Sequence, residues 1–115
     1  MRQQDLVWVR LPFSDFEGGK VRPAVVVSND DYNRSNQDVV VCAVTSNTEP
    51  RPYGVLISQE SLSSGKLPIK SKVRADKILQ IEKSLLAASF ARLSDAAFDS
   101  LIAELIKLVR RYEPG

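Results

Sequence analysis

The stretch GGKVRPAVVVSND (residues 18–30) places two glycines and an Arg-Pro step directly before a run of valines. Runs of β-branched residues bounded by glycine and by polar turn residues are typical of strands. Proline cannot donate to the hydrogen-bond ladder, so within a sheet it is confined to edges and to the first residues of a strand. We therefore predict a strand over residues 22–28 that places Arg22 where a loop enters a sheet.

A hairpin partner for this strand precedes it in the chain. Residues 6–12 (LVWVRLP) alternate in the manner of a strand, and we expect Trp8 to lie in the core. Residues 13–20 contain two acids and a glycine pair, which predict the connecting loop. Phe13 and Phe16 of this loop either stack on nucleic-acid bases or pack against the sheet.

Three more strands are predicted further along the chain. The polar residues 29–38 predict a turn that can include one helical turn. Residues 39–46 (VVVCAVTS) predict a strand that is buried on both faces, because its apolar run is unbroken. Residues 53–58 (YGVLIS) predict another strand, and residues 59–68 a loop or a short helical turn.

The last predicted strand covers residues 69–81 (IKSKVRADKILQI) and alternates apolar with charged residues. Side chains two apart on a strand point to the same face. One face of this strand therefore presents Lys72, Arg74 and Asp76, and Arg74 can act together with Asp76.

The C-terminal third changes to a helical period. Ser94 is a favourable helix cap, and Asp95 suits the positive N-terminal end of a helix. Apolar residues follow at helical spacing, namely Phe98, Leu101, Ile102, Leu105 and Val109. Five or so short strands followed by one amphipathic helix predict a mainly β protein, a small and strongly bent barrel with the helix over one opening.

Length and composition restrict the class of protein. A chain of 115 residues allows one domain with its own core, and we expect residues 1–115 to form it. Hydrophobic residues at 43% and charged residues at 26% argue against disorder. No apolar stretch approaches the length of a membrane span and no signal-like start is present, so we expect a cytoplasmic protein without a membrane partner.

The rare residue types restrict the chemistry. Cys42 is the only cysteine, which excludes an intrachain disulfide, and we expect it to be a small buried hydrophobe. The chain has no histidine, so any catalysis proceeds without the commonest general base and metal ligand. A net charge of +2 permits an anionic partner such as RNA or an acidic polypeptide.

Four polar residues at strand ends or faces are candidates for chemistry: Arg22, Thr45, Arg74 and Asp76. A carboxylate beside a guanidinium can take a proton from a hydroxyl while the guanidinium stabilises a phosphate. The residues alone also allow plainer interpretations, since such ion pairs are often solvated and Thr45 is also an ordinary strand residue. The lysines at 66, 70, 72 and 77 either form a basic strip or only keep the surface soluble.

The order of these segments resembles a known family. DLVWVRLPF, GGKVRPAVVVSND, VVVCAVTSN, VRADKILQIEKSLL and ARLSDAAFDSLIAEL follow one another as in the MazF/PemK family of toxin endoribonucleases. The resemblance covers nearly the whole chain. It implies an SH3-like β-barrel, usually a homodimer, that cuts single-stranded RNA without a metal or other cofactor.

The resemblance also implies roles for individual residues. Arg22 matches the arginine that acts on the scissile phosphate, and Thr45 matches a threonine of the catalytic pocket. Arg74 and Asp76 match an arginine and an aspartate that serve as general acid and general base in one branch of the family. We expect the RNA to be contacted by four more residues: Phe16, Lys20, Ser46 and Lys77. Many members carry glutamine and arginine where this chain has Lys77 and Leu79, so we expect a different cleavage preference.

A mechanism without histidine follows from these roles. Asp76, or a water that it orients, draws the proton from a ribose 2′-hydroxyl, and Arg22 with Arg74 stabilises the charged phosphorus centre. The products are a 2′,3′-cyclic phosphate and a 5′-hydroxyl, and DNA cannot react because it lacks the nucleophile. The resemblance further implies a cognate antitoxin that is acidic and partly disordered. The alternative is a non-catalytic barrel that binds RNA or a protein target such as gyrase.

Overall fold

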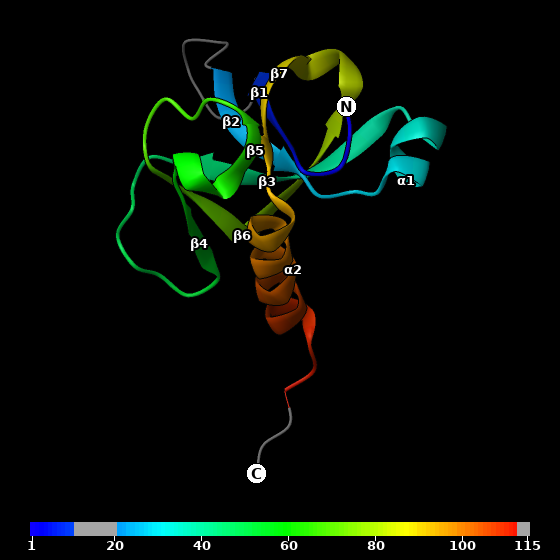
Figure 1. The fold of residues 1–115 in the computed structure, drawn as a ribbon. Helices are drawn as coiled ribbons and strands as arrows, with labels where there is room; N and C mark the ends of the chain where they lie inside the picture. The colour runs from blue at the N-terminus through cyan, green and yellow to red at the C-terminus, as the bar shows by residue number, and fades with distance from the viewer. Residues whose placement is uncertain (11–20, 113–115) are drawn as a thin grey trace, which may run out of the picture.

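The computed structural model describes residues 1–10 and 21–112. Within them, seven antiparallel strands form one curled sheet, and a long helix follows at the C-terminal end (Figure 1). The strands are β1 (Asp5–Arg10), β2 (Val21–Val26), β3 (Asp38–Thr45), β4 (Gly54–Ile57), β5 (Leu62–Gly65), β6 (Ser71–Glu82) and β7 (Leu86–Leu93). The spatial order of the strands is β4-β6-β3-β2-β1-β7-β5. The predicted class, a mainly β protein with a C-terminal helix, is confirmed.

A large irregularity in β6 produces much of the curl. Cys42 of β3 lies opposite Ile78, but Val44 lies opposite Val73. Residues 74–77 of β6 therefore stand opposite Ala43 alone. Extra residues in one strand bend it and change the direction of its side chains. This bulge carries Arg74, Asp76 and Lys77, so the distortion and the predicted site coincide.

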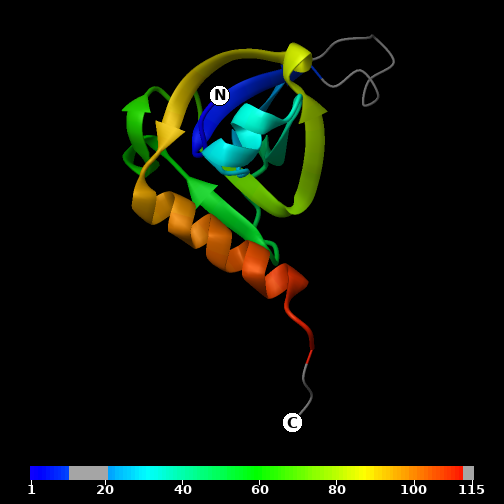
Figure 2. The same ribbon diagram turned by 90° about the vertical axis from the view of Figure 1, so that its right-hand side faces the viewer.

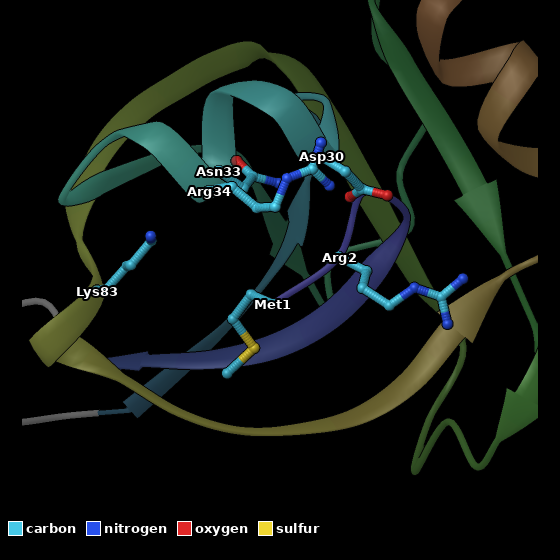
Figure 3. Close-up of a pocket in the computed structure, with 6 residues that line it drawn as sticks. All are labelled: Met1, Arg2, Asp30, Asn33, Arg34 and Lys83. Atoms are coloured by element: carbon cyan, nitrogen blue, oxygen red, sulfur yellow. The ribbon is translucent and has the colours of Figure 1, made fainter.

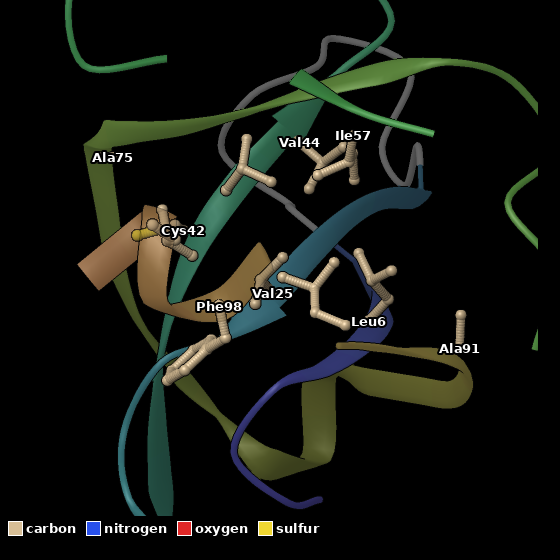
Figure 4. Packing of buried hydrophobic residues seen from close by; sticks show 11 residues of the cluster. Leu6, Val25, Cys42, Val44, Ile57, Ala75, Ala91 and Phe98 are labelled. Carbon is tan, nitrogen blue, oxygen red and sulfur yellow. The ribbon is translucent and has the colours of Figure 1, made fainter. Parts of the chain in front are cut away.

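Two apolar clusters stabilise the two sides of the sheet. One contains Cys42 and Val44 of β3, and Figure 4 shows it between the curled strands and the C-terminal helix. The other contains Val39 and Val41 of the same strand, together with valines of β1 and β2. Val39 and Val41 thus bury one face of β3, and Cys42 and Val44 bury the other further along, whereas Val40 and Ala43 are half-buried. The prediction that this strand is buried on both faces is confirmed in part.

The C-terminal helix α2 (Asp95–Val109) packs its apolar face on β6 and β4. Ser94 caps it, because its hydroxyl accepts a hydrogen bond of 3.2 Å from the backbone N–H of Ala97. Phe98 and Leu101 are buried in the first cluster. Figure 2 shows α2 running alongside β4 below the curled sheet. The predicted helix and its cap are confirmed.

The remaining elements are short. Helix α1 (Asp30–Ser35) is capped by Asn29, which confirms a helical turn between β2 and β3. Two 3₁₀ turns, η1 (Gln59–Ser61) and η2 (Lys83–Leu85), introduce the strands that follow them.

Two strands were not predicted from the sequence. β5 lies in residues 59–68, which the sequence predicted as a loop or helical turn, and β7 lies in residues without any assignment. Both have weak patterns, since LSSG is short and polar and LAASFARL does not alternate cleanly. Both are paired through irregular registers, so their pairing with neighbouring strands decides their structure.

Candidate functional site

A cavity of about 500 Å³ opens where β2, β3 and β6 approach one another. Its polar lining consists of Arg22, Thr45, Ser46, Ser71, Arg74 and Lys77. Its apolar lining consists of Trp8, Pro23, Ala43, Val44, Leu67, Pro68, Ile69 and Phe90. We call this the arginine cavity. The structure thus brings together five of the predicted site residues from three separate strands or their ends.

Pairing within the sheet places Arg22 at the start of β2. Arg22 pairs with Val9 of β1, and Pro23 pairs with Trp8. Arg22 is exposed, whereas the strand becomes fully buried from Ala24 onward. The cation therefore lies where the strand leaves the core, which is the position that the Arg-Pro step predicted.

Arg74 lines the cavity, whereas Asp76 does not. Asp76 instead binds Arg74 through hydrogen bonds. The Asp76 carboxylate accepts two bonds of 3.1 Å from Arg74, one from Nε to Oδ1 and one from Nη2 to Oδ2. Oδ2 also accepts a bond of 2.9 Å from Nη2 of Arg51. A bidentate pair of this kind fixes the plane of a guanidinium. Asp76 therefore orients Arg74 at the cavity wall.

These contacts shift the titration of both partners. The hydrogen bonds from Arg74 hold the pKa of the Asp76 carboxyl below its usual range, and the charges of Arg74 and Arg51 act in the same direction. The hydrogen bond to Asp76 in turn raises the pKa of Arg74. The carboxylate is therefore ionised at neutral pH, but it is a weak base while both guanidinium groups remain bound.

Arg51 is a site residue that sequence reasoning missed. It lies in the segment between β3 and β4, which has no periodic pattern, and no local signal connects it with Asp76. Lys72 ties this segment to the sheet, since its Nζ donates a bond of 2.6 Å to the backbone carbonyl of Glu49. Lys72 is only 3% exposed, so the prediction that it lies on an open face beside Arg74 is wrong. The segment that carries Arg51 folds over it.

Gly54 is required where this segment joins β4. A Cβ at Gly54 would lie 2.8 Å from Cδ of Lys72 and 3.3 Å from Cγ of Arg51. Both are closer than ordinary contacts between such atoms. The missing side chain therefore makes room for the buried lysine stem and for the arginine that binds Asp76.

Thr45 and Ser46 lie at the end of β3. The Thr45 hydroxyl accepts a bond of 3.1 Å from the backbone N–H of Asn47, which turns the chain away from the strand. Its own O–H is left to donate toward the cavity that it lines. Ser46 is exposed at the same rim.

An aromatic pair forms part of the apolar wall. The rings of Trp8 and Phe90 are stacked, with centroids 4.6 Å apart and planes inclined by 24°. Both side chains are only half-buried, so the prediction that Trp8 lies in the core is wrong. Phe90 was not predicted as a site residue because its strand, β7, was not predicted.

Some predicted contacts lie outside the described residues. Phe16 and Lys20, together with Phe13, belong to residues 11–20, so their role toward RNA stays a prediction. Cys42 is fully buried, and burial raises the pKa of its thiol to about 12, with a smaller contribution from the charge of Asp76. This confirms that Cys42 is a buried apolar residue, and a thiol with this pKa is not a nucleophile at neutral pH.

Another hollow, near the N-terminus, is lined by Met1, Arg2, Asp30, Asn33, Arg34 and Lys83. Figure 3 shows that its basic side chains do not converge, since Arg2 points away from Arg34 and Lys83. Asp30 accepts a bond of 2.9 Å from the backbone N–H of Gln3 and so ties down the N-terminal segment. No predicted site residue lines this hollow.

The described part of the chain contains no candidate metal site. In residues 1–10 and 21–112, no three Cys, Asp or Glu side chains lie together in a way that could hold a metal ion. None of the helices in these residues is long and apolar enough to span a bilayer.

Comparisons with known proteins agree on one family. The family model described as "PemK-like, MazF-like toxin of type II toxin-antitoxin system" matches residues 2–109. No curated protein matches the chain.

Solved structures of the same fold cover almost the whole chain. MazF from Deinococcus radiodurans is 25% identical with a TM-score of 0.76, over 96% of this chain and 97% of that one. A MazE–MazF complex from the same organism is 23% identical with a TM-score of 0.78, over 97% and 98% of the two chains. A mycobacterial endoribonuclease in complex with its cognate antitoxin is 20% identical with a TM-score of 0.78, over 99% of each chain. The family model and this curled sheet together show that the chain belongs to the PemK-like, MazF-like toxin family of type II toxin–antitoxin systems.

Proposed function

We propose that this protein is an endoribonuclease that cuts single-stranded RNA at the arginine cavity. The observation that carries the proposal is that Arg22 and Arg74 line one cavity with Thr45, while Asp76 holds Arg74 through a bidentate bond. Two guanidinium groups suit the growing negative charge on a phosphate under attack. The attacking group is the neighbouring ribose 2′-hydroxyl, so this scheme requires no metal.

Asp76 is the proposed base, and substrate binding is what makes it basic enough. In the free protein its oxygens accept bonds from Arg74 and Arg51. A phosphate that enters the cavity shares the N–H donors of Arg74 with Asp76, while the guanidinium keeps its position. Weaker hydrogen bonding from Arg74 raises the pKa of Asp76 toward its usual range, because the Arg74 hydrogen bond is the main cause of its lowered value. Asp76 does not line the cavity itself, so the carboxylate takes the 2′-hydroxyl proton through a water that it orients.

The step forms a bond between the 2′-oxygen and phosphorus and breaks the bond from phosphorus to the 5′-oxygen. The leaving 5′-oxygen takes up a proton from solvent water, and the proton taken from the 2′-hydroxyl is returned to solvent. The products are a 2′,3′-cyclic phosphate and a 5′-hydroxyl. Arg22 and Arg74 stabilise the crowded phosphorus centre, and the Thr45 hydroxyl donates to one of its oxygens. Ser46 and Lys77, at the rim of the cavity, contact the flanking nucleotides.

We also propose a homodimer and an acidic, partly disordered antitoxin as partners. The cavity has a cationic lining, and Ile69 at its apolar rim is 61% exposed. An acidic segment that folds on binding matches both features and would block the RNA. The complexes of similar toxins with their cognate antitoxins support this proposal. The molar mass in solution, by light scattering, tests the dimer.

The test of the activity is cleavage of an end-labelled, mixed-sequence single-stranded RNA in the presence of EDTA. The wild type should leave cyclic phosphate and 5′-hydroxyl ends, and Arg22→Ala should cut about 10²- to 10³-fold more slowly. Arg110→Ala, at the exposed end of α2, is the matched control for loss of one positive charge. Absence of cleavage by folded, partner-free wild type on varied RNA sequences would contradict the proposal.

A non-catalytic RNA-binding barrel is the second candidate. The doubly bound, weakly basic carboxylate of Asp76 favours it, because such a group orients Arg74 without moving a proton. RNA affinity and cleavage, measured on the same Arg22→Ala variant, separate the candidates. An enzyme loses far more cleavage than affinity, whereas a binding module has no cleavage to lose.

A further inference from the structure

The lining of the arginine cavity contains two chemically different groups of side chains. The first group, here called the cationic wall, is Arg22, Arg74 and Lys77. The second group, here called the aromatic wall, is the stacked pair of Trp8 and Phe90, which belongs to the apolar lining. The proposed cleavage chemistry uses only the cationic wall. The aromatic wall therefore needs an explanation of its own.

Core packing accounts for this aromatic pair only in part. Fully buried side chains of the strands belong to the two apolar clusters, and Trp8 is in neither. Phe90 only borders the first cluster. Both side chains are half-buried and border open space of about 500 Å³, a volume in the range of small-molecule sites. Aromatic surface left open at a cavity indicates a binding surface.

The cavity brings this aromatic surface together with the proposed phosphate site. Trp8 lies directly opposite Pro23 in the β1–β2 ladder, and both residues line the cavity together with Arg22. A nucleotide has the same two-part chemistry, with a flat apolar base on one side and an anionic phosphate on the other. Unpaired bases stack on aromatic side chains with little dependence on sequence, because every base has a π-face.

We propose that the Trp8–Phe90 pair is a subsite for one unpaired nucleobase of the RNA, next to the phosphate held by Arg22 and Arg74. The inference rests on the proposed function, since it names how that site grips its substrate. The base packs against the aromatic wall, and its own phosphate or the adjacent one reaches the cationic wall. The subsite explains why a single strand is required, because a paired base cannot leave its stack to enter the cavity.

The single tryptophan of the chain makes this subsite directly observable. The probe is a mixed-sequence single-stranded RNA oligonucleotide with 2′-O-methyl riboses, which binds but offers no nucleophile. Its partner is an abasic oligonucleotide of the same length and charge. We expect the base-bearing probe to quench Trp8 fluorescence and to bind about tenfold more tightly than the abasic probe.

Phe90→Leu is the decisive variant, because it keeps an apolar side chain beside the core but removes the aromatic face. We expect its affinity for the base-bearing probe to fall about tenfold, with its affinity for the abasic probe unchanged. Phe90→Tyr should restore the difference. Tyr112→Ala removes an aromatic residue that is 83% exposed at the far end of α2, and it should change neither affinity.

The outcomes separate this inference from the proposed function. Equal wild-type affinity for both probes, with RNA cleavage intact, overturns the base subsite and leaves the nuclease standing. A loss of abasic binding in Phe90→Leu also overturns it, because the residue then supports the fold and not the base. Failure of the wild type to bind either probe or to cut RNA overturns both proposals together.

Discussion

The arginine cavity and the C-terminal end of α2 are both rich in positive charge, yet they differ in how that charge is held. The end of α2 forms a hollow of about 800 Å³ lined by Tyr53, Lys107, Leu108, Arg110, Arg111 and Tyr112. Its cations are exposed, and within the described residues Lys107 pairs only with Glu104, one helical turn away. In the arginine cavity, by contrast, the part-buried carboxylate of Asp76 binds Arg74 through two hydrogen bonds and is itself bound by Arg51.

This comparison shows that neither positive charge nor cavity volume distinguishes the candidate functional site from the hollow at the end of α2. The hollow at the end of α2 is the larger of the two, but within residues 1–10 and 21–112 no carboxylate binds any of its arginines. A catalytic cation stabilises a transition state only if its position is set before the substrate arrives. Pre-organisation by Asp76, Arg51 and the buried Lys72 distinguishes the cavity, and the following variants test each of these residues.

The largest effect is expected for Asp76→Asn, which removes both the proposed base and the anchor of Arg74. Cleavage should fall about 10²- to 10⁴-fold, the range of a lost general base. The control is the circular dichroism spectrum, which should remain that of the wild type. Cleavage within a few-fold of the wild type would show that Asp76 neither takes the proton nor fixes Arg74.

The same variant also tests the pH dependence of stability. The folded-state pKa of Asp76 lies below its usual value, so its contribution to stability is present above that value and is lost as the pH falls through the folded-state pKa. Chemical denaturation of the wild type should therefore show stability lost below about pH 4. Asp76→Asn should lack this part of the pH dependence. Parallel curves for the two proteins would mean that the ion pair contributes nothing to stability.

Removal of Arg51 should have an intermediate effect. Arg51→Ala leaves Arg74 in place but deletes one positive charge beside Asp76, so the pKa of Asp76 should rise. The acidic limb of the cleavage–pH profile should therefore move toward higher pH. Arg51→Lys should restore part of the shift. A profile that only drops in height without moving would assign Arg51 to RNA contact and not to Asp76.

Gly54→Ala tests the contact between Lys72 and the segment that carries Arg51. The added methyl group meets Cδ of Lys72 at 2.8 Å, and such overpacking costs about 1–3 kcal/mol. In a Lys72→Ala background, where that stem is gone, the cost of Gly54→Ala should largely disappear. Equal costs in the two backgrounds, measured by urea denaturation, would refute the contact.

The smallest effect is expected at the other basic region. Replacing Arg110 and Arg111 together by alanine should leave cleavage at physiological salt within about threefold, since exposed charges are screened beyond about 8 Å. RNA affinity measured against salt concentration should keep a similar slope. A loss as large as that of Arg22→Ala would mean that the substrate also binds at the end of α2.

Much of the fold follows from local patterns. The valine run after Arg22, the apolar β3 and the capped α2 are each encoded by neighbouring residues, because strand and helix periods and caps are local properties. β5 and β7 are not, since their short or irregular sequences become strands only by pairing with the rest of the sheet. Trp8 was misplaced for the same reason, because its stacking partner comes from β7.

The candidate site divides in the same way. The sequence by itself determined where the side chains of the proposed chemistry stand: Arg22 at the start of a strand, Thr45 at the end of a strand, and Arg74 and Asp76 two apart on one strand. Only the tertiary structure decided that Arg51 would bind Asp76, that Lys72 would be buried, and that Phe90 would stack on Trp8. The physical reason is the range of the interactions: alternation along a strand needs only neighbours, whereas these contacts join segments that a bulge and a curled sheet bring together.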